Sequence, residues 1–138
     1  MIQFISEEVK LPVLSKQKII RWIKETAGMY GKKTGEIAYI FCTDKRILEV
    51  NRQYLKHDFY TDIITFDTSQ GGFISGDIFI STETVKNNAA EFNVSFDQEL
   101  KRILIHGILH LCGQEDKTTE LRLEMTRKED LALGIYSE

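Results

Sequence analysis

The sequence predicts an α+β fold in which helices pack around a small mixed β-sheet. Hydrophobic residues make up 42% of the 138 residues and only one residue is proline, a composition typical of a compact globular core. The expected strands and helices neither alternate strictly nor fall into separate blocks, and we find no repeat, linker or low-complexity segment. We therefore expect one domain over residues 1–138.

An apolar segment near the N-terminus predicts a strand, and a helix should follow it. Residues 2–5 are short and apolar enough for a strand, and Pro12 or Ser15 can begin the helix. Gly28 and Gly31 lie where this helix should end, because glycine favours helix termination.

A second strand and helix are expected directly afterwards. Residues 36–42 are rich in β-branched and aromatic side chains, which is typical of strands. Thr43 or Asp44 can then act as the N-cap of a helix that reaches about Tyr54.

Two further strands should form an antiparallel hairpin. Residues 61–66 and 73–80 both favour strands, and residues 67–72 between them are rich in turn-forming side chains. Gly76 interrupts the second strand. A glycine there indicates a bulge, or a place where something such as an extended polymer approaches the backbone closely.

The last part of the chain predicts three helices. The first should cover residues 81–91, with the serine at its start as N-cap. Ser95 and Gln98 have the spacing of a capping box and should begin the second helix. The third should cover residues 118–134, capped by the threonine at its start.

The second of these helices contains the most informative motif, His-x3-His followed by x5-Asp. His106 and His110 stand four residues apart, so on a helix their imidazoles lie on one side and can share a metal ion. Gly113 can adopt a left-handed backbone and return the chain toward the two rings, where we expect Asp116 to arrive. Two imidazoles and one carboxylate leave coordination positions open, as in a catalytic metal site.

The motif also admits other interpretations. Two histidines on a buried helix can be ordinary core residues with satisfied ring nitrogens, but this helix is apolar nearly all round and its rings need polar partners. Gly107 stands where a zinc protease has its glutamate base, so a protease is disfavoured. Cys112 follows the motif closely and is more simply a buried thiol than a ligand. Iron oxygenases also use two histidines and one carboxylate.

The distribution of charge and the cysteine content narrow the range of functions further. Residues 1–60 carry 11 Lys and Arg against 7 Asp and Glu, whereas residues 61–138 carry 7 against 14. The basic part could therefore bind a polyanion while the acidic part holds a metal. Two distant cysteines without a disulfide pattern, together with no membrane-spanning or signal segment, predict a cytoplasmic protein that does not bind membranes.

With these motifs in view, the chain resembles the bacterial YbeY family of endoribonucleases and rRNA maturation factors. The resemblance rests on residues 51–54, 61–66, 76–78 and, most specifically, 106–113. It implies a zinc-dependent endoribonuclease with a metalloprotease-like α+β fold and one Zn²⁺ per chain. It also implies single-stranded RNA as substrate, 16S rRNA 3′ end processing, and the small ribosomal subunit and its assembly factors as partners, with no role for DNA.

The third metal ligand departs from the family pattern. The family usually has a histidine where this chain has Asp116, and because a carboxylate oxygen also binds zinc the site should survive with altered affinity. Glu115 and His57 are the alternative ligands. Asp62 and Asp77 could support the site or be structural residues at strand ends.

A second departure concerns the cation expected to face the RNA phosphate. The family usually has an arginine just after Tyr54, where this chain has Leu55. Arg52 or Lys56 could supply the charge instead, although lysine lacks the bidentate fork of guanidinium. This loss makes a ribosome-assembly factor that binds RNA without cutting it the main competing hypothesis.

Overall fold

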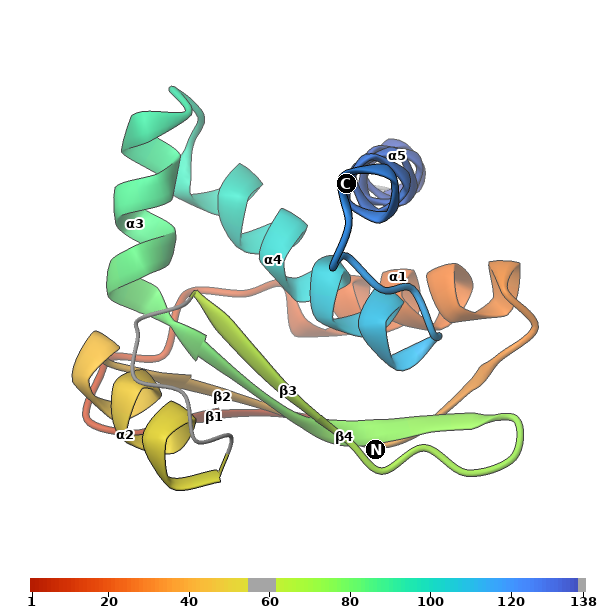
Figure 1. Ribbon diagram of the computed structural model, residues 1–138, viewed down its shortest axis with the longest axis horizontal. Helices are drawn as coiled ribbons and strands as arrows, with labels where there is room; N and C mark the ends of the chain where they lie inside the picture. Colours follow the sequence, from red (N-terminus) through yellow and green to blue (C-terminus); the bar gives the residue numbers. More distant parts are fainter. Residues whose placement is uncertain (55–61, 137–138) are drawn as a thin grey trace.

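A computed structural model describes residues 1–54 and 62–136 and shows a four-stranded mixed sheet (Figure 1). The strand order is β1-β2-β4-β3. The first two pairings are parallel and the β3–β4 pairing is antiparallel. The strands are β1 (Ile2–Ser6), β2 (Lys33–Cys42), β3 (Ile63–Asp67) and β4 (Phe73–Ser81). The predicted α+β class and the predicted hairpin are therefore confirmed.

Helices cover both faces of this sheet (Figure 1). One face, which carries the larger core, packs against α1, α3 and α4, and α5 lies on the outer side of α4. Helix α2 packs on the opposite face against a smaller cluster that includes Ile47, Val50 and Ile64. The helices are α1 (Lys16–Met29), α2 (Asp44–Tyr54), α3 (Thr82–Glu91), α4 (Phe96–Leu111) and α5 (Thr119–Ile135). None of the described helices is long and apolar enough to cross a membrane.

The predicted caps account for where the later helices begin. Ser81 and Thr118 each accept a hydrogen bond from the backbone N–H three residues on, and Ser95 forms a reciprocal capping box with Gln98. Ser15 rather than Pro12 precedes α1, because the segment before Ser15 is not helical.

Gly76 shows a close approach of backbone, but the neighbour is not an external polymer. A Cβ atom at this position would lie 2.3 Å from the carbonyl oxygen of Phe66 on the paired strand β3. Any side chain would therefore push β3 away from β4. The predicted close approach at Gly76 is therefore confirmed, with the paired strand β3 as the neighbour in place of an extended polymer. The predicted bulge has a counterpart in the β2–β4 pairing, whose register shifts between Thr34 and Ile37, the residue paired with Gly76.

Helix α4 lies directly on the sheet because Gly107 has no side chain. A Cβ atom there would lie 3.0 Å from Cδ1 of Ile78 and 3.3 Å from Cδ1 of Ile63. Glycine thus lets the helix backbone approach the strands closely. The position that holds a glutamate in zinc proteases faces the packed core here, and this brings the neighbouring histidines to the edge of the α4–sheet interface.

Candidate metal centre

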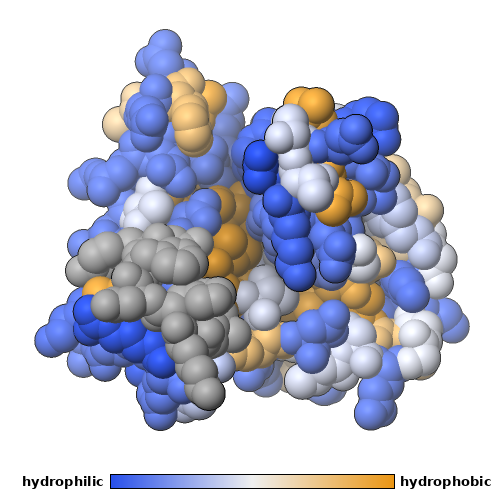
Figure 2. Space-filling model, in the orientation of Figure 1, coloured by the Kyte–Doolittle hydropathy of each residue, from blue (hydrophilic) through white to orange (hydrophobic). Residues whose placement is uncertain are grey.

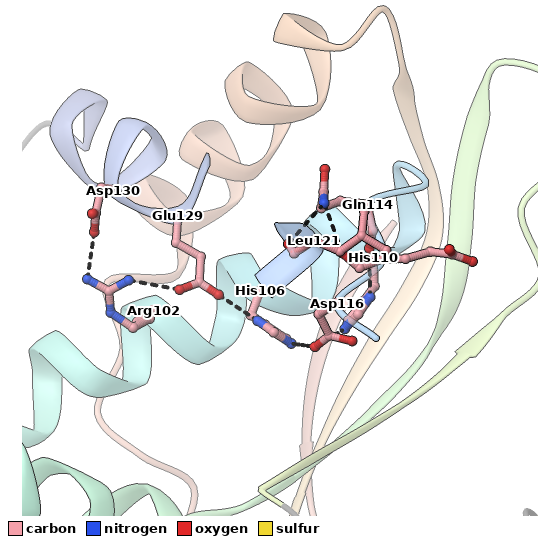
Figure 3. A network of polar contacts seen from close by, with 9 residues as sticks. Arg102, His106, His110, Gln114, Asp116, Leu121, Glu129 and Asp130 are labelled. Carbon is pink, nitrogen blue, oxygen red and sulfur yellow. Dashed lines mark hydrogen bonds and ion pairs between the residues drawn. The ribbon is translucent and has the colours of Figure 1, made fainter. Parts of the chain in front are cut away.

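The three predicted ligands converge at the C-terminal end of α4 (Figure 3). Nε2 of His106 and Nε2 of His110 each lie 3.5 Å from Oδ2 of Asp116. One ligand atom from each residue lies within 4.8 Å of the other two, and all three side chains are partly exposed. This cluster could hold one metal ion and leave room for further ligands.

The turn after α4 places Asp116 as predicted. Cys112 caps the helix, and Gly113 follows with a φ of +103°. The N–H of Gly113 donates to the carbonyl of His110 at 2.9 Å, and the N–H of Gln114 donates to the carbonyl of Leu109 at 3.0 Å. These bonds satisfy the last carbonyls of the helix and reverse the chain, so that Asp116 returns to the two rings.

His106 is oriented by a residue that the sequence did not suggest, Glu129 of α5. Nδ1 of His106 donates to Oε2 of Glu129 at 2.5 Å, and this carboxylate is only 6% exposed. Oε1 of Glu129 accepts from Arg102 at 2.8 Å, and Arg102 also binds Asp130 at 2.8 Å (Figure 3). Because Glu129 occupies Nδ1, Nε2 is the nitrogen of His106 that is available to a metal ion.

His110 is oriented by the turn itself. Its Nδ1 donates to the carbonyl oxygen of Gln114 at 2.9 Å. The buried Gln114 side chain accepts from Lys128 at 2.6 Å and donates to the carbonyl of Glu115 at 2.8 Å. Each imidazole therefore has its Nδ1 engaged and its Nε2 directed at Asp116, which is the arrangement a shared ion requires.

The two histidines differ in electrostatic surroundings. Burial lowers the pKa of His106, but the hydrogen bond and charge of Glu129, with Asp116 and Asp62, outweigh burial and raise it. Burial and the neighbouring His106 lower the pKa of His110, and Asp116 opposes them only in part. His110 is thus predisposed to the neutral form that binds metals, whereas a metal at His106 must compete with a proton.

A comparison with protein families decides which family this fold and site represent. The family described as Endoribonuclease YbeY matches residues 1–137. The chain belongs to the YbeY family. Endoribonuclease YbeY of Phocaeicola vulgatus is 56% identical over 137 residues, which cover 99% of each protein. Its counterpart in Parabacteroides distasonis is 54% identical over 137 residues, 99% of this chain and 96% of the relative.

A solved structure supports the fold of this YbeY-family chain. The solution structure of TM1509 from Thermotoga maritima superposes with a TM-score of 0.63 at 26% sequence identity. The match covers 97% of this chain and 90% of TM1509.

Other residues considered from the sequence lie outside the metal cluster or outside the described residues. Among the described residues, the candidate cluster contains neither Glu115 nor Cys112. Burial raises the pKa of the Cys112 thiol to about 11, so this sulfur is a poor metal ligand at neutral pH. Leu55, Lys56 and His57 are outside the described part of the chain, so their expected roles stay predictions.

Asp62, Asp77 and Arg52 have different surroundings. Asp62 is close enough for its charge to raise the pKa of His106, which fits a supporting role. Asp77 alternates with the buried Ile78 along β4, so it lies on the opposite face of the sheet from α4. Arg52 is exposed near the end of α2 and does not belong to the metal cluster. Its role in RNA binding stays a prediction.

Proposed function

We propose that this chain is a metal-dependent endoribonuclease for single-stranded RNA, acting as one domain over residues 1–138. The observation that carries the proposal is the open cluster of His106, His110 and Asp116 in a chain whose full-length relatives are named endoribonuclease YbeY. We further propose rRNA as substrate, in 16S 3′ end maturation and late assembly of the small ribosomal subunit. A cytoplasmic location goes with this role.

Zinc is the metal we propose, one ion per chain. Two imidazole nitrogens and one carboxylate oxygen suit zinc, and zinc in an open site supplies Lewis acidity and acidifies bound water. The same donor types serve iron in oxygenases. Elemental analysis of protein purified without added metal distinguishes the two, because an iron-containing, zinc-free preparation would contradict the zinc proposal.

The chain's own groups prepare the site for phosphodiester hydrolysis. Glu129 and the Gln114 carbonyl hold both Nε2 atoms toward one point, so the geometry is set before RNA arrives. Asp116 supplies the anionic donor where the family usually has a neutral imidazole. Its negative charge would lower the Lewis acidity of a metal held by these three residues.

The basic N-terminal part is proposed to attract the RNA. Residues 1–60 carry a net charge of +4, and Arg52 and Lys56 are the candidates for contact with phosphate. Leu55, in place of the family's arginine, favours one second candidate: an assembly factor that binds RNA without cutting it.

Cleavage of a single-stranded RNA by purified protein tests the proposal. We expect cleavage with zinc, none with a chelator, and none for the double variant His106→Ala/His110→Ala. Cys112→Ser is the matched control, because it removes a potential metal donor beside the cluster and should retain metal and activity. RNA binding without any cleavage by the zinc-loaded protein would favour the assembly factor.

A further inference from the structure

A cleft lies beside the metal cluster, along the first turns of α4. Its volume is about 620 Å³, which is within the usual range for small-molecule sites. Figure 2 shows this hollow between the part of the surface formed by α3 and that formed by α5, with hydrophobic surface on its floor. The residues that line it come from α4, α5 and the turn before α4, and include Phe92, Glu99, Lys101, Arg102, Glu129 and Tyr136.

Glu99 is a buried polar group of this cleft that has no hydrogen-bond partner among the described residues. Its side chain is only 5% exposed, and no described residue donates a hydrogen bond to its carboxylate. Among the described residues, Glu99 has no side-chain oxygen that is both fully buried and unpaired. Its carboxylate therefore keeps some exposure, and Glu99 lines the cleft. Burial raises the pKa of Glu99, Arg102 opposes this, and Asp62 and Glu129 reinforce it. Buried carboxylates normally accept hydrogen bonds, so Glu99 is suited to accept them from a bound molecule.

The charges in the cleft favour a neutral group with donors over an anion. Arg102 is already bound by Glu129 and Asp130, and Lys101 is bound by Asp97 at 2.9 Å. The carboxylates of Glu99 and Glu129 would repel a phosphate placed inside. The occupant should therefore bring N–H groups to Glu99 while it keeps any negative charge outside.

Aromatic side chains at the mouth of the cleft suit a flat ring. Phe92 is 60% exposed in the turn between α3 and α4, and Val94 beside it is also exposed. Tyr136 lines the cleft near the C-terminal end of α5. Exposed aromatic side chains next to a buried hydrogen-bonding group are the usual means of binding an unstacked RNA base.

The cleft and the metal cluster have Glu129 in common. One side of this residue lines the cleft, and its Oε2 binds His106. Glu99 and His106 are seven residues apart on α4, so they lie about two turns apart on one side of the helix. An RNA strand whose phosphate is at the cluster would therefore bring a neighbouring base to the cleft.

We infer that this cleft is a base-binding subsite for guanine next to the scissile phosphate, with Glu99 accepting hydrogen bonds from the base and Phe92 stacking on it. The inference rests on the proposed function. Guanine is the base that presents two adjacent donors, N1–H and the N2 amino group, to a carboxylate that only accepts. Uracil would place carbonyl oxygens against Glu99.

Binding of short RNAs to chelator-treated protein tests the subsite without any cleavage. The probes are fluorescent oligoadenosine heptamers that carry G, A, C or U at the central position, and the readout is anisotropy. We expect the G probe to bind about tenfold more tightly than the U probe. Glu99→Gln should remove this preference and favour A, because an amide offers one donor and one acceptor.

Two further variants separate the subsite from general effects. Phe92→Ala, at a largely exposed position, should weaken binding of all four probes about tenfold through loss of stacking. Glu25→Gln removes a negative charge from the exposed side of α1 and should leave the order of the probes unchanged. If Glu99→Gln does not fold, as judged by circular dichroism, the Phe92→Ala result decides.

The inference is overturned if wild-type protein binds the four probes equally, if Glu99→Gln retains the preference for G, or if Phe92→Ala binds as wild type. Binding of a lysine-rich peptide in place of RNA, lost in Glu99→Gln, would also overturn it and make the cleft a protein-docking site. Mapping of the cut position with zinc separates the two proposals. Cleavage without base preference sustains the nuclease and removes the subsite, whereas base preference without cleavage does the reverse.

Discussion

Replacement of Glu129 by glutamine tests how far the metal site depends on α5. The carboxylate accepts from Nδ1 of His106 at 2.5 Å and from Arg102 at 2.8 Å. A glutamine has one oxygen for these two donors, so its NH₂ group must face either His106 or Arg102. If it faces His106, the ring must carry its proton on Nε2, the atom that should bind the metal. If it faces Arg102, two donors meet in a buried place.

The magnitude follows from these contacts. An unsatisfied buried hydrogen-bonding group costs about 1–3 kcal/mol, and loss of a carboxylate behind a ligating histidine lowers metal affinity about 10- to 100-fold. Each tenfold change corresponds to about 1.4 kcal/mol, so the two figures agree. We expect the zinc dissociation constant of Glu129→Gln to rise about 10- to 100-fold, measured by competition with a chromophoric chelator.

Asp130→Asn provides the control for Glu129→Gln. Asp130 also binds Arg102 at 2.8 Å, but it is largely exposed and does not contact His106. Exposed ion pairs are worth only about 0–1 kcal/mol, so its zinc affinity should stay within a fewfold of wild type. Equal zinc affinities for Glu129→Gln and wild type would refute the reasoning. The ¹⁵N chemical shifts of His106 report its tautomer directly and separate misorientation of the ring from general unfolding.

Three further predictions concern pH, packing and salt. Because the pKa of His106 is raised, zinc affinity should increase as the pH rises through that pKa, and zinc titrations across about pH 5 to 8 should show it. In metal-free protein the raised pKa of His106 also stabilises the fold. This stabilisation is complete below the unfolded-state pKa and is lost as the pH rises through the folded-state pKa, which thermal unfolding measures. Gly107→Glu should destabilise the fold by more than about 3 kcal/mol, because its Cβ would crowd Ile78 and its charge would be buried; Gly28→Ala, with open space around the Cβ, should not destabilise it. RNA affinity should fall at least tenfold between about 50 and 200 mM salt, and a constant affinity would exclude the basic part as the RNA contact.

Much of the fold was predictable because its signals are local. Ser81, Ser95 and Thr118 act as N-caps where a single side chain and the next three residues decide the helix start. The hairpin was predictable for the same reason, since turn-forming residues connect two short β-rich segments. Strand order and the faces covered by each helix depend on contacts between distant segments, and no local pattern predicts them.

The candidate ligands were predictable because they lie within eleven residues. Helical spacing brings His106 beside His110, and a left-handed Gly113 returns Asp116 to them. In contrast, the sequence left the reason for Gly76 open between a bulge and a close neighbour. A glycine in a strand indicates that something is close, but the sequence does not say whether the neighbour is the paired strand or a ligand.

Glu129 could not be predicted because the sequence of α5 does not show which side of the helix is buried. Apolar residues occur all round it: Met125 and Ala132 are buried, whereas Leu123 and Leu131 are largely exposed. Without a clear apolar stripe, none of the acidic residues of α5 stands out as the one that faces α4. The available signal was Arg102, four residues before His106, which needs an anionic partner on the same side of α4.

The packing of helix α5 affects the orientation of both histidines. Its consecutive residues Lys128 and Glu129 reach the site by different routes, one through Gln114 and the other directly to His106. The helix is in turn fixed by Trp22 of α1, whose Nε1 donates to the carbonyl of Ala132 at 2.6 Å. A change in the docking of α5 would therefore move both ring supports together. The orientation of His106 and His110 therefore depends on α5, a helix that begins after Asp116 in the sequence.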